Sequence, residues 1–505
     1  MDNDALSFDN PFTMEGTVLP DLDELIDAVF NDQSLLVSEG GVDSLFFNPY
    51  HKHHICPVRS LITARQTIVE QHDVQEGRTD MQGISWRAGE RGKHIFRENR
   101  DHLRAPAHTY PFYDKLPSLV ENRDVINYDG NEYYRFRYTD TNVHCSHHHP
   151  QLRNLVYATS KNDVYYLRKA TAWTLLRDME SECWATYARR SFNPRGSPIV
   201  RFSPSLDDNT IKHWSPQRRS SKAVLGRPLR NLHSRVPHNI TTMAAMDEFL
   251  MIGGEDGSFT FMNLQSCENP VFDSFTTVHY LEVNGIEITR SRTGDPIAYM
   301  SSNDHIDQQL RCLDLATLQV SATFPTSAFI NFASQSPDGH MLAVVGDETE
   351  GHVMSVNSRE KIATLKGHQR YSFSVAWSPD SRMLATGNDD RSTCIFDTRM
   401  LSTPVHILSR DVQESVRSLR YSSCGRYLAM AEDRHYVHIV DTTTDYSQAQ
   451  KIDFVGDISG ISFTPDGESL YIGVSSIDFS SLLEFEKARP SWGGDMNDQF
   501  DPLYF

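Results

Sequence analysis

The sequence predicts an all-β chain whose larger part is a seven-bladed β-propeller. A short turn, Ser-Pro-Asp or a close variant, begins at Ser336, Ser378, Ser422 and Thr464, at spacings of 42, 44 and 42 residues. That period is typical of a four-stranded propeller blade. Each turn joins two short apolar segments that cannot bury their faces alone, so the units have to stack side by side.

Strand patterns extend this repeat over residues 132–487. Alternating aromatic and basic residues begin at Tyr133, and a hairpin across 155–167 is expected to start the first blade, which carries an insertion at about 169–210. Further blades are expected at about 241–263, 283–315, 325–365, 366–409, 410–452 and 453–487. The last unit lacks an outermost strand. Because an open ring exposes strand edges, we expect residues within about 90–142 to supply that strand.

The segments outside the propeller have different compositions. Residues 1–50 are predicted to be a disordered acidic tail, since they contain eleven acidic residues and no Lys or Arg, in a chain of net charge −19. Residues 51–131 are predicted to be an irregular His-rich extension with a helical run near 60–70, and 488–505 a loose tail. The acidic balance argues against general nucleic-acid binding.

Cysteine usage and hydropathy indicate in which cellular compartment the protein is expected. The seven cysteines are odd in number and scattered, as expected in a reducing environment. The sequence has no run of eighteen apolar residues and no basic-then-apolar N-terminus, so we expect neither a membrane span nor a secretory signal. The cytoplasm or the nucleus is the expected location.

An amphipathic helix is predicted inside the acidic tail. Acidic residues follow Pro20, and five apolar residues then fall on one helical face: Leu22, Leu25, Ile26, Val29 and Phe30. Such a helix either docks on its own propeller or serves as a short ligand helix for another protein.

A basic stretch lies between Asn209 and Met246, where the sequence contains no acidic residue. Its candidate patch residues are Arg218, Arg219, Lys222, Arg227 and Arg230. Three interpretations stay open: a solvated loop, an intramolecular clamp for residues 1–50, or a contact for an acidic partner.

Two clusters of His and Cys could together hold a zinc ion, because imidazole and thiolate are zinc ligands. The first cluster contains His51, His53, His54 and Cys56. The second contains His144, Cys145, His147 and His149. Neither cluster has paired CxxC or HxxxH spacing, and histidine-rich surface loops often bind nothing specific. A protein without any cofactor is the alternative.

The unit from Gly367 to Arg399 resembles a WD40 repeat. It contains a Gly-His pair, the Ser-Pro-Asp turn and an aromatic-Asp dipeptide, Phe396-Asp397. The resemblance implies a buried hydrogen-bonded network of four residues, which map to His368, Thr386, Asp390 and Phe396. Phe396 stands where the family has Trp and has no N–H to donate, so we expect a network of three members.

The same blade resembles the WDxR box of WD40 proteins that act as substrate receptors. Such receptors dock on the triple-propeller adaptor of cullin-4 ubiquitin ligases. The resemblance rests on Leu384 to Gly387, Asp389 and the run from Ile395 to Arg399, again with Phe396 in place of Trp. It implies that Asp397 and Arg399 contact the adaptor, because an arginine at the end of the third strand can make bidentate polar contacts. The alternative is that Arg399 is an ordinary surface residue.

A wider resemblance covers about 150–487 without the insertion. The runs from Arg153 to Tyr165 and from Ser480 to Phe485, together with the late blades, are similar to a fungal and plant family of WD-repeat proteins. That family has no assigned reaction, so the resemblance implies the fold more than it implies a function.

No catalytic motif stands out in the sequence, which contains no P-loop, dinucleotide glycine fingerprint, GxSxG or HExxH. We therefore expect a non-catalytic scaffold that binds partner proteins. One alternative is the cullin-4 receptor, and a second is a transcriptional co-regulator that recruits partners through the helix around Leu25 to Phe30.

Overall fold

The structure is a computed structural model. It describes residues 61–108, 124–169, 209–226 and 240–488, with gaps at 129, 148, 150–152, 216–218, 256, 266–269, 275–281, 303–308, 327–328, 410 and 477–478. The predicted acidic tail with its helix, the C-terminal tail, most of the 169–210 insertion and the first predicted zinc cluster lie outside the described residues.

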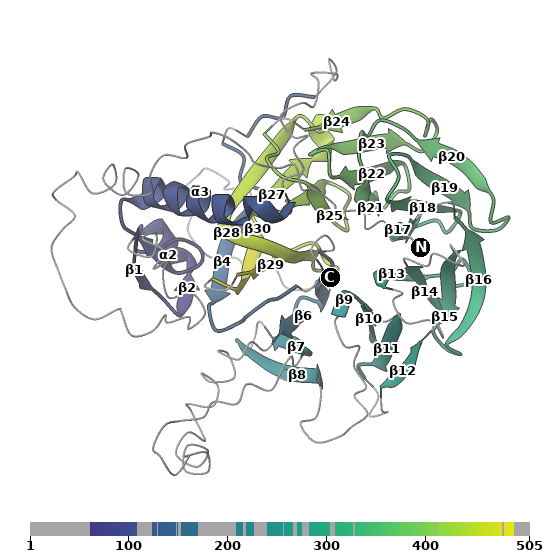
Figure 1. Cartoon of the computed structure of the whole chain (residues 1–505), viewed down its shortest axis with the longest axis horizontal. Helices are drawn as coiled ribbons and strands as arrows, with labels where there is room; N and C mark the ends of the chain where they lie inside the picture. The colour runs from purple at the N-terminus through teal and green to yellow at the C-terminus, as the bar shows by residue number, and fades with distance from the viewer. Residues whose placement is uncertain are drawn as a thin grey trace, which may run out of the picture.

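Five four-stranded antiparallel sheets surround a central axis (Figure 1). The first contains β5 (Val156–Ser160), β6 (Asp163–Lys169), β7 (Asn209–Ser215) and β8 (Ser220–Gly226). The second contains β9 (Ile240–Met246), β10 (Phe249–Gly254), β11 (Ser258–Asn263) and β12 (Val271–Ser274). The third contains β13 (Val283–Arg290), β14 (Pro296–Ser302), β15 (Gln309–Asp314) and β16 (Gln319–Pro325).

The fourth sheet contains β17 (Ile330–Gln335), β18 (Met341–Gly346), β19 (Gly351–Ser355) and β20 (Lys361–Leu365). The fifth contains β21 (Ser372–Trp377), β22 (Met383–Asn388), β23 (Thr393–Asp397) and β24 (His406–Leu408). In each of these sheets the chain runs outward strand by strand, so the strands neighbour one another in sequence order.

Eight further strands form one sheet, which corrects the expectation of seven separate blades. Its strands are β25 (Val416–Tyr421), β26 (Tyr427–Glu432), β27 (Arg434–Asp441), β28 (Gln448–Phe463), β29 (Ser469–Ser475), β30 (Ser481–Lys487), β4 (Tyr134–Asp140) and β2 (Ile68–Glu70). A 3₁₀ turn at Thr442–Thr444 precedes β28.

Strand β28 is 16 residues long and joins the last two units. Residues 448–453 pair with β27, whereas 458–463 pair with β29, and Asp457 pairs with both strands. The chain therefore passes from the outer edge of one unit to the inner edge of the next without leaving the strand conformation. The innermost strands contact one another in a closed order: β5, β9, β13, β17, β21, β25, β28 and again β5.

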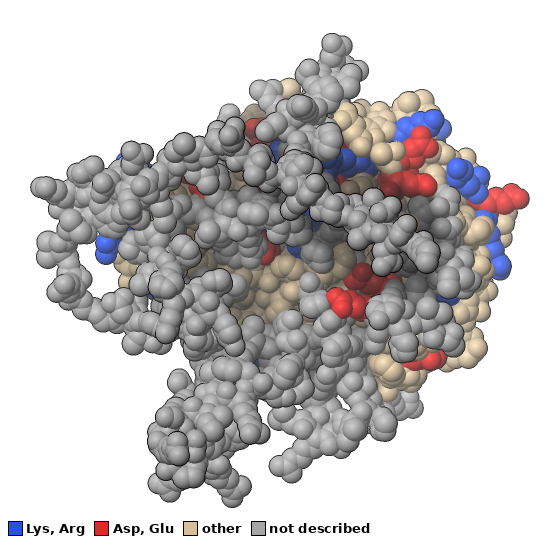
Figure 2. Space-filling view, in the orientation of Figure 1, with Lys and Arg blue, Asp and Glu red and all other residues tan. Residues whose placement is uncertain are grey.

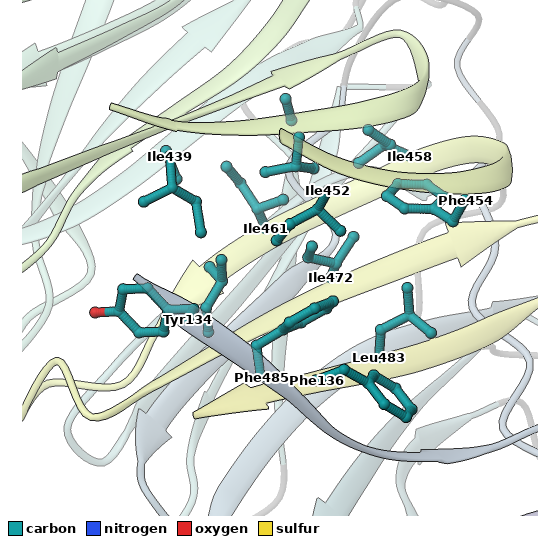
Figure 3. Close-up of a cluster of buried hydrophobic side chains, with 14 of the residues drawn as sticks. Tyr134, Phe136, Ile439, Ile452, Phe454, Ile458, Ile461, Ile472, Leu483 and Phe485 are labelled. Atoms are coloured by element: carbon teal, nitrogen blue, oxygen red, sulfur yellow. The ribbon is translucent and has the colours of Figure 1, made fainter. Parts of the chain in front are cut away.

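Strand β4 closes the ring. It lies before the first blade in sequence and pairs antiparallel with β30, as the outermost strand of the last unit. This is the strand that the sequence analysis expects from 90–142. Figure 3 shows Tyr134 and Phe136 of β4 among the side chains of β28, β29 and β30 in a buried apolar cluster. The rings of Phe136 and Phe485 meet edge to face, with centroids 5.8 Å apart.

The repeated turns have the same internal hydrogen bonds, which confirms that they occupy equivalent corners of neighbouring sheets. Ser378 Oγ donates to Asp380 Oδ1 at 2.6 Å and accepts from the Met383 amide at 2.9 Å. Ser336 repeats both bonds, with Asp338 and with the Met341 amide. Thr464 does the same with Asp466 and the Ser469 amide. A hydroxyl residue followed two positions later by Asp thus fixes three of the four turns, and at Ser422 the thiol of Cys424 takes the place of the Asp carboxylate.

The extension is regular in its described part, contrary to the expectation for 51–131. A two-stranded sheet pairs β1 (Ile62–Arg65) with β3 (Ile84–Trp86), and β2 adds to the outer edge of β4. The predicted helical run near 60–70 therefore consists of strands. The helices are α2 (Gln71–Gln75) and α3 (Gly89–His108), which lie beside β4 and β28 in Figure 1. None of the described helices is long and apolar enough to span a bilayer.

The extension is bound tightly to the last two units. Lys93 and Arg97 of α3 both reach Asp453 Oδ1, at 2.9 and 2.5 Å. The buried amide of Gln82 donates to the carbonyl of Val455 and accepts from its N–H, at 2.8 and 2.6 Å. These contacts make the extension part of the propeller's hydrophobic and polar packing.

The closing strand generates the first prediction. Replacing Phe136 with Ala leaves a cavity beside Phe485, so the free energy of unfolding should fall by about 3 kcal/mol. Urea denaturation followed by tryptophan fluorescence measures this. Arg135→Ala in the same strand removes only a surface ion pair with Glu132 and should change stability by less than about 1 kcal/mol. Equal losses for both variants would contradict the role of β4 packing.

Candidate functional site

The propeller has two faces that differ in their loops. At one face the chain enters the innermost strand of each sheet, and we call this the inter-blade face. In the fifth sheet it carries residues 366–371 and 389–392. The turn face is opposite and carries the Ser-Pro-Asp turns and the loops after the third strands, such as Thr398 and Arg399. Figure 2 shows Asp and Glu side chains near the middle of the face toward the viewer, and mixed charges along the rim.

His368 is the centre of a buried network in the fifth sheet. Its Nε2 lies 2.7 Å from Thr386 Oγ1, and its Nδ1 lies 3.2 Å from Asp390 Oδ2. Ser392, which the sequence analysis did not single out, joins at 3.1 Å from the same Nδ1 and donates to Asp390 Oδ1. Phe396 is fully buried and packs with apolar residues instead of bonding.

Charge stabilises this network. Burial alone disfavours an imidazolium, but contacts with Cys394 and Asp390 raise the pKa of His368. Burial would likewise raise the pKa of Asp390, but the hydrogen bond and charge of His368 lower it. The pair is therefore ionic near neutral pH, and it connects the loop before β21 with the loop after β22. Its position inside the blade gives it a structural role.

A second polar network lies one unit further on. His438 and Glu432 are fully buried, with Nε2 and Oε1 2.6 Å apart, and the other ring nitrogen of His438 lies 2.9 Å from the Tyr128 hydroxyl. Burial raises the pKa of Tyr128, which keeps the phenol protonated. Tyr128 comes from the segment before β4, whose Ile126 is buried in the same sheet. Sequence inspection offers no local signal for this long-range contact.

Arg399 lies on the turn face with 88% of its side chain exposed. Asp397 holds its guanidinium from one side, since Nε and Nη2 donate to the two carboxylate oxygens at 2.9 and 2.5 Å. These hydrogen bonds lower the pKa of Asp397 to about 2. The next residue, Met400, also has an exposed side chain. The structure thus brings together the two residues of the WDxR resemblance.

The inter-blade face carries a group of charged residues that sequence reasoning missed. We call the arginine cluster the set Arg153, Arg370, Arg391, Arg417 and Arg434. Arg153 Nη2 and Arg417 Nε lie 2.9 and 3.4 Å from Asp433 Oδ1. Burial would raise the pKa of Asp433, but the guanidinium groups of Arg153 and Arg417 lower it well below its usual range.

A second carboxylate continues this group into the neighbouring sheet. Arg370 Nη1 lies 3.0 Å from one oxygen of Asp389, and Arg417 Nη2 lies 3.4 Å from the other. Asp389 and Asp433 are 44 residues apart, the same spacing as the turns at Ser378 and Ser422. That equivalence is the sequence signal that could have revealed the cluster.

Only part of the predicted basic patch can be placed. Arg219 Nη1 bonds Glu70 Oε1 of the extension at 2.5 Å, and its guanidinium carbon lies 4.4 Å from the centre of the Tyr138 ring. Arg218, Arg227 and Arg230 lie outside the described residues, as does the side chain of Lys222. Arg219 therefore contacts the extension, and the acidic-tail clamp stays a prediction.

The second zinc cluster is spread over different environments. Cys145 is buried among apolar side chains, and burial raises the pKa of its thiol, which disfavours the thiolate that zinc needs. His149 Nε2 lies 3.3 Å from Glu282 Oε1. In the described part of the chain no three His, Cys, Asp or Glu residues are grouped as metal ligands. Because the first cluster lies outside that part, zinc binding stays a prediction.

Comparison with known proteins identifies the repeat. The family model for the WD domain, G-beta repeat, matches residues 359–397. The chain is 28% identical over 216 residues to an uncharacterised protein of Schizosaccharomyces pombe, a match that covers 37% of this chain and 59% of the relative. It is 35% identical over 78 residues to Protein LST8 homolog of Drosophila melanogaster, covering 14% of this chain and 25% of that protein.

A solved structure entitled Crystal Structure of Mitotic Checkpoint Complex contains a chain that superposes with a TM-score of 0.49 and 15% identity. The match covers 68% of this chain and 90% of that one. The matched segments span less than two thirds of both curated relatives.

The His368 network generates the second prediction. Asp390→Asn leaves a buried imidazolium without its counter-charge, so the free energy of unfolding at pH 7 should fall by about 3 kcal/mol. Because the pKa of Asp390 is lowered by folding, its contribution is present above the ordinary carboxyl pKa and is lost as the pH falls through the folded value. The difference between the two proteins should therefore shrink toward pH 3.

Urea denaturation at pH 7, 5 and 3 measures that difference. Glu350→Gln, which affects an exposed pair with Lys366, is the control and should change stability by less than about 0.5 kcal/mol. A difference that stays the same or grows between pH 5 and pH 3 would contradict the ionic assignment.

Proposed function

We propose that this WD40-repeat protein is a non-catalytic scaffold whose two propeller faces bind partner proteins in the cytoplasm or nucleus. The observation that supports it is the closed ring of innermost strands, which holds the loops of all sheets in fixed relative positions. Rigid scaffolds with variable loops are suited to recognition. The polar networks around His368 and His438 are buried inside sheets, where they stabilise the fold rather than meet a substrate.

The test of the scaffold function is affinity purification of the tagged full chain under mild salt, followed by mass spectrometry. Proteins that co-purify at near-stoichiometric amounts, and that bind the purified chain directly, are the expected result. A chain that co-purifies with nothing above the background of an unrelated tagged propeller would contradict the proposal.

A second candidate, the cullin-4 substrate receptor, is supported by the geometry of Arg399. Its guanidinium is exposed on the turn face, and the bidentate contact with Asp397 limits the orientations that it can adopt. A guanidinium held in this way can donate to acceptors of a docked protein with little loss of side-chain entropy. Exposed Met400 beside it adds apolar contact area.

This candidate gives the third prediction. Arg399→Ala should reduce binding to the purified cullin-4 adaptor at least about tenfold, the range for an interface arginine, measured by biolayer interferometry. Arg359→Ala is the control, because Arg359 is exposed in the corresponding loop of the preceding sheet. Undetectable binding of the unaltered chain, or equal binding of all three proteins, would reject the receptor role and leave other partners to the purification experiment.

The co-regulator alternative depends on the predicted helix at Leu22 to Phe30, which lies outside the described residues. A reporter fusion of residues 1–50 that stays silent would reject it.

A further inference from the structure

The turn between β13 and β14 differs at one position from the Ser-Pro-Asp turns on the same face (Figure 1). It reads Ser291-Arg292-Thr293-Gly294, where the turn of the next sheet reads Ser336-Pro337-Asp338-Gly339. In both turns the glycine amide donates to the serine carbonyl, at 2.9 and 2.8 Å, and the glycine has a positive φ. Thr293 therefore occupies the position of Asp338, an aspartate that recurs in two more of the turns.

The two hydroxyl groups of this turn have different surroundings. Ser291 Oγ accepts from the backbone amides of Thr293 and Asp295, at 3.2 and 3.1 Å, so it holds the turn together. The Thr293 hydroxyl donates to the side chain of Asp295 and contacts Ser291 Oγ at 2.7 Å. Thr293 and Asp295 are both exposed. The threonine hydroxyl thus lies at the surface of the turn face.

Arg290 contacts this turn and also links it to the second sheet. Its Nη1 donates to the carbonyl of Gly294 at 3.0 Å, and its Nη2 lies 2.7 Å from Asp247 Oδ2. Asp247 belongs to the turn between β9 and β10, so the ion pair joins corresponding turns of neighbouring sheets. About half of each side chain is exposed. A surface pair of this kind adds little stability and can exchange partners.

Arg292 makes the corresponding contact with the fourth sheet. A methyl group in place of the Gly339 hydrogen would lie 2.5 Å from Arg292 Cγ, so the arginine side chain lies against that glycine. Burial would raise the pKa of Asp338, but hydrogen bonds within its own turn and the charges of His340 and Arg292 lower it. Thr293 is therefore flanked by two arginines that reach the turns on either side.

Arginines close to an exposed threonine are a pattern that kinases with an acidic substrate groove recognise. Arg290 and Arg292 lie three positions and one position before Thr293, and residues 288–294 contain no Asp or Glu. Carboxylates in such a groove pair with the guanidinium groups and select a hydroxyl group at a fixed spacing from them.

We propose that Thr293 is phosphorylated by a serine/threonine kinase that recognises Arg290 and Arg292, and that the phosphate takes Arg290 from Asp247. The kinase transfers the γ-phosphoryl group of MgATP: a bond forms between the phosphorus and Thr293 Oγ1, the bond to the β–γ bridging oxygen breaks, and ADP leaves. The hydroxyl proton passes to the catalytic-loop carboxylate of the kinase. The Thr293 oxygen then no longer donates to Asp295.

The phosphate changes the charge of the turn face. It carries about −1.5 to −2 at pH 7, more than the Asp247 carboxylate with which it competes for Arg290. Around Arg290 and Arg292, the carboxylates of Asp247, Asp295 and Asp338 already outnumber the guanidinium groups. The phosphate would make this part of the face strongly acidic, so it would repel acidic partner proteins. This consequence rests on the proposed scaffold function, whereas the phosphorylation itself does not.

The first experiment incubates the folded full chain with MgATP and a kinase-active extract of its natural host cells. Mass spectrometry then measures the phosphate at Thr293. Arg290→Gln should slow the reaction at least about tenfold, the effect of losing one charge-assisted contact with the kinase. Arg359→Gln is the control and should leave the rate unchanged, because Arg359 is exposed in a turn-face loop of the fourth sheet. Thermal unfolding midpoints verify that each variant is folded.

Three results would overturn the site: no phosphate at Thr293, phosphate at Ser291 in its place, or reaction only after heat denaturation. If Arg290→Gln reacts as fast as Arg359→Gln, recognition through Arg290 is wrong.

The second experiment tests where the phosphate binds, by a ³¹P NMR pH titration of the phosphorylated chain. A free phosphothreonine loses its second proton near about pH 6. A neighbouring guanidinium favours the dianion, so the midpoint should be higher in the phosphorylated Arg290→Gln chain, prepared by longer incubation, by about 0.5 pH unit or more. Equal midpoints would refute the exchange of Arg290 from Asp247 to the phosphate. None of these outcomes affects the scaffold function, which the purification of partners tests separately.

Discussion

The pairing of β4 with β30 is the constraint on which the rest of the structure depends. A propeller whose last sheet lacks its outer strand leaves a row of unpaired backbone groups at one edge. Here that strand comes from residues 134–140, before the first blade, so the two ends of the repeat region are held by one antiparallel ladder. The apolar side chains of β4 enter the core of the last unit, and hydrogen bonding and burial therefore act together.

Ring closure also determines where side chains meet. Arg153 precedes the first sheet and Asp433 belongs to the last units, yet they form an ion pair at 2.9 Å because the circle brings them together. The inter-blade face is therefore charged and internally paired, whereas the turn face presents Arg399 to solvent. Two surfaces of different chemistry on one rigid disc can serve different partners at the same time.

The repeat could be predicted because its signal is local. A Ser or Thr two residues before Asp determines the turn within five positions, and the period of these turns gives the architecture. The same local reasoning locates His368, Thr386 and Asp390, which lie within one blade. It finds the residues at Arg399 and Asp397 as well, since they are neighbours in sequence.

The parts that could not be predicted rely on distant contacts. Tyr128 completes a network with His438, more than 300 residues away, and no pattern around Tyr128 indicates it. Strands β1 and β3 pack through Ile62, Ile84 and Trp86 against Val455 and Phe479 of the last unit, and no local pattern indicates these distant contacts. Strand β28 joins the last two units because the chain stays in the strand conformation as it crosses between them. The hydropathy pattern of the sequence does not indicate this path.

The position of the closing strand has a consequence for biosynthesis. Strand β4 leaves the ribosome early, but β30, its partner, is made roughly 340 residues later. At 5–20 residues per second this interval lasts about 20–70 s. During that time Phe136 lacks the packing of Phe485, and the edge of β4 that faces β30 has no partner strand, so we expect the nascent chain to need protection by chaperones until its final sheet emerges. Chains that stop before Ser481 would keep this edge exposed and become substrates for quality control.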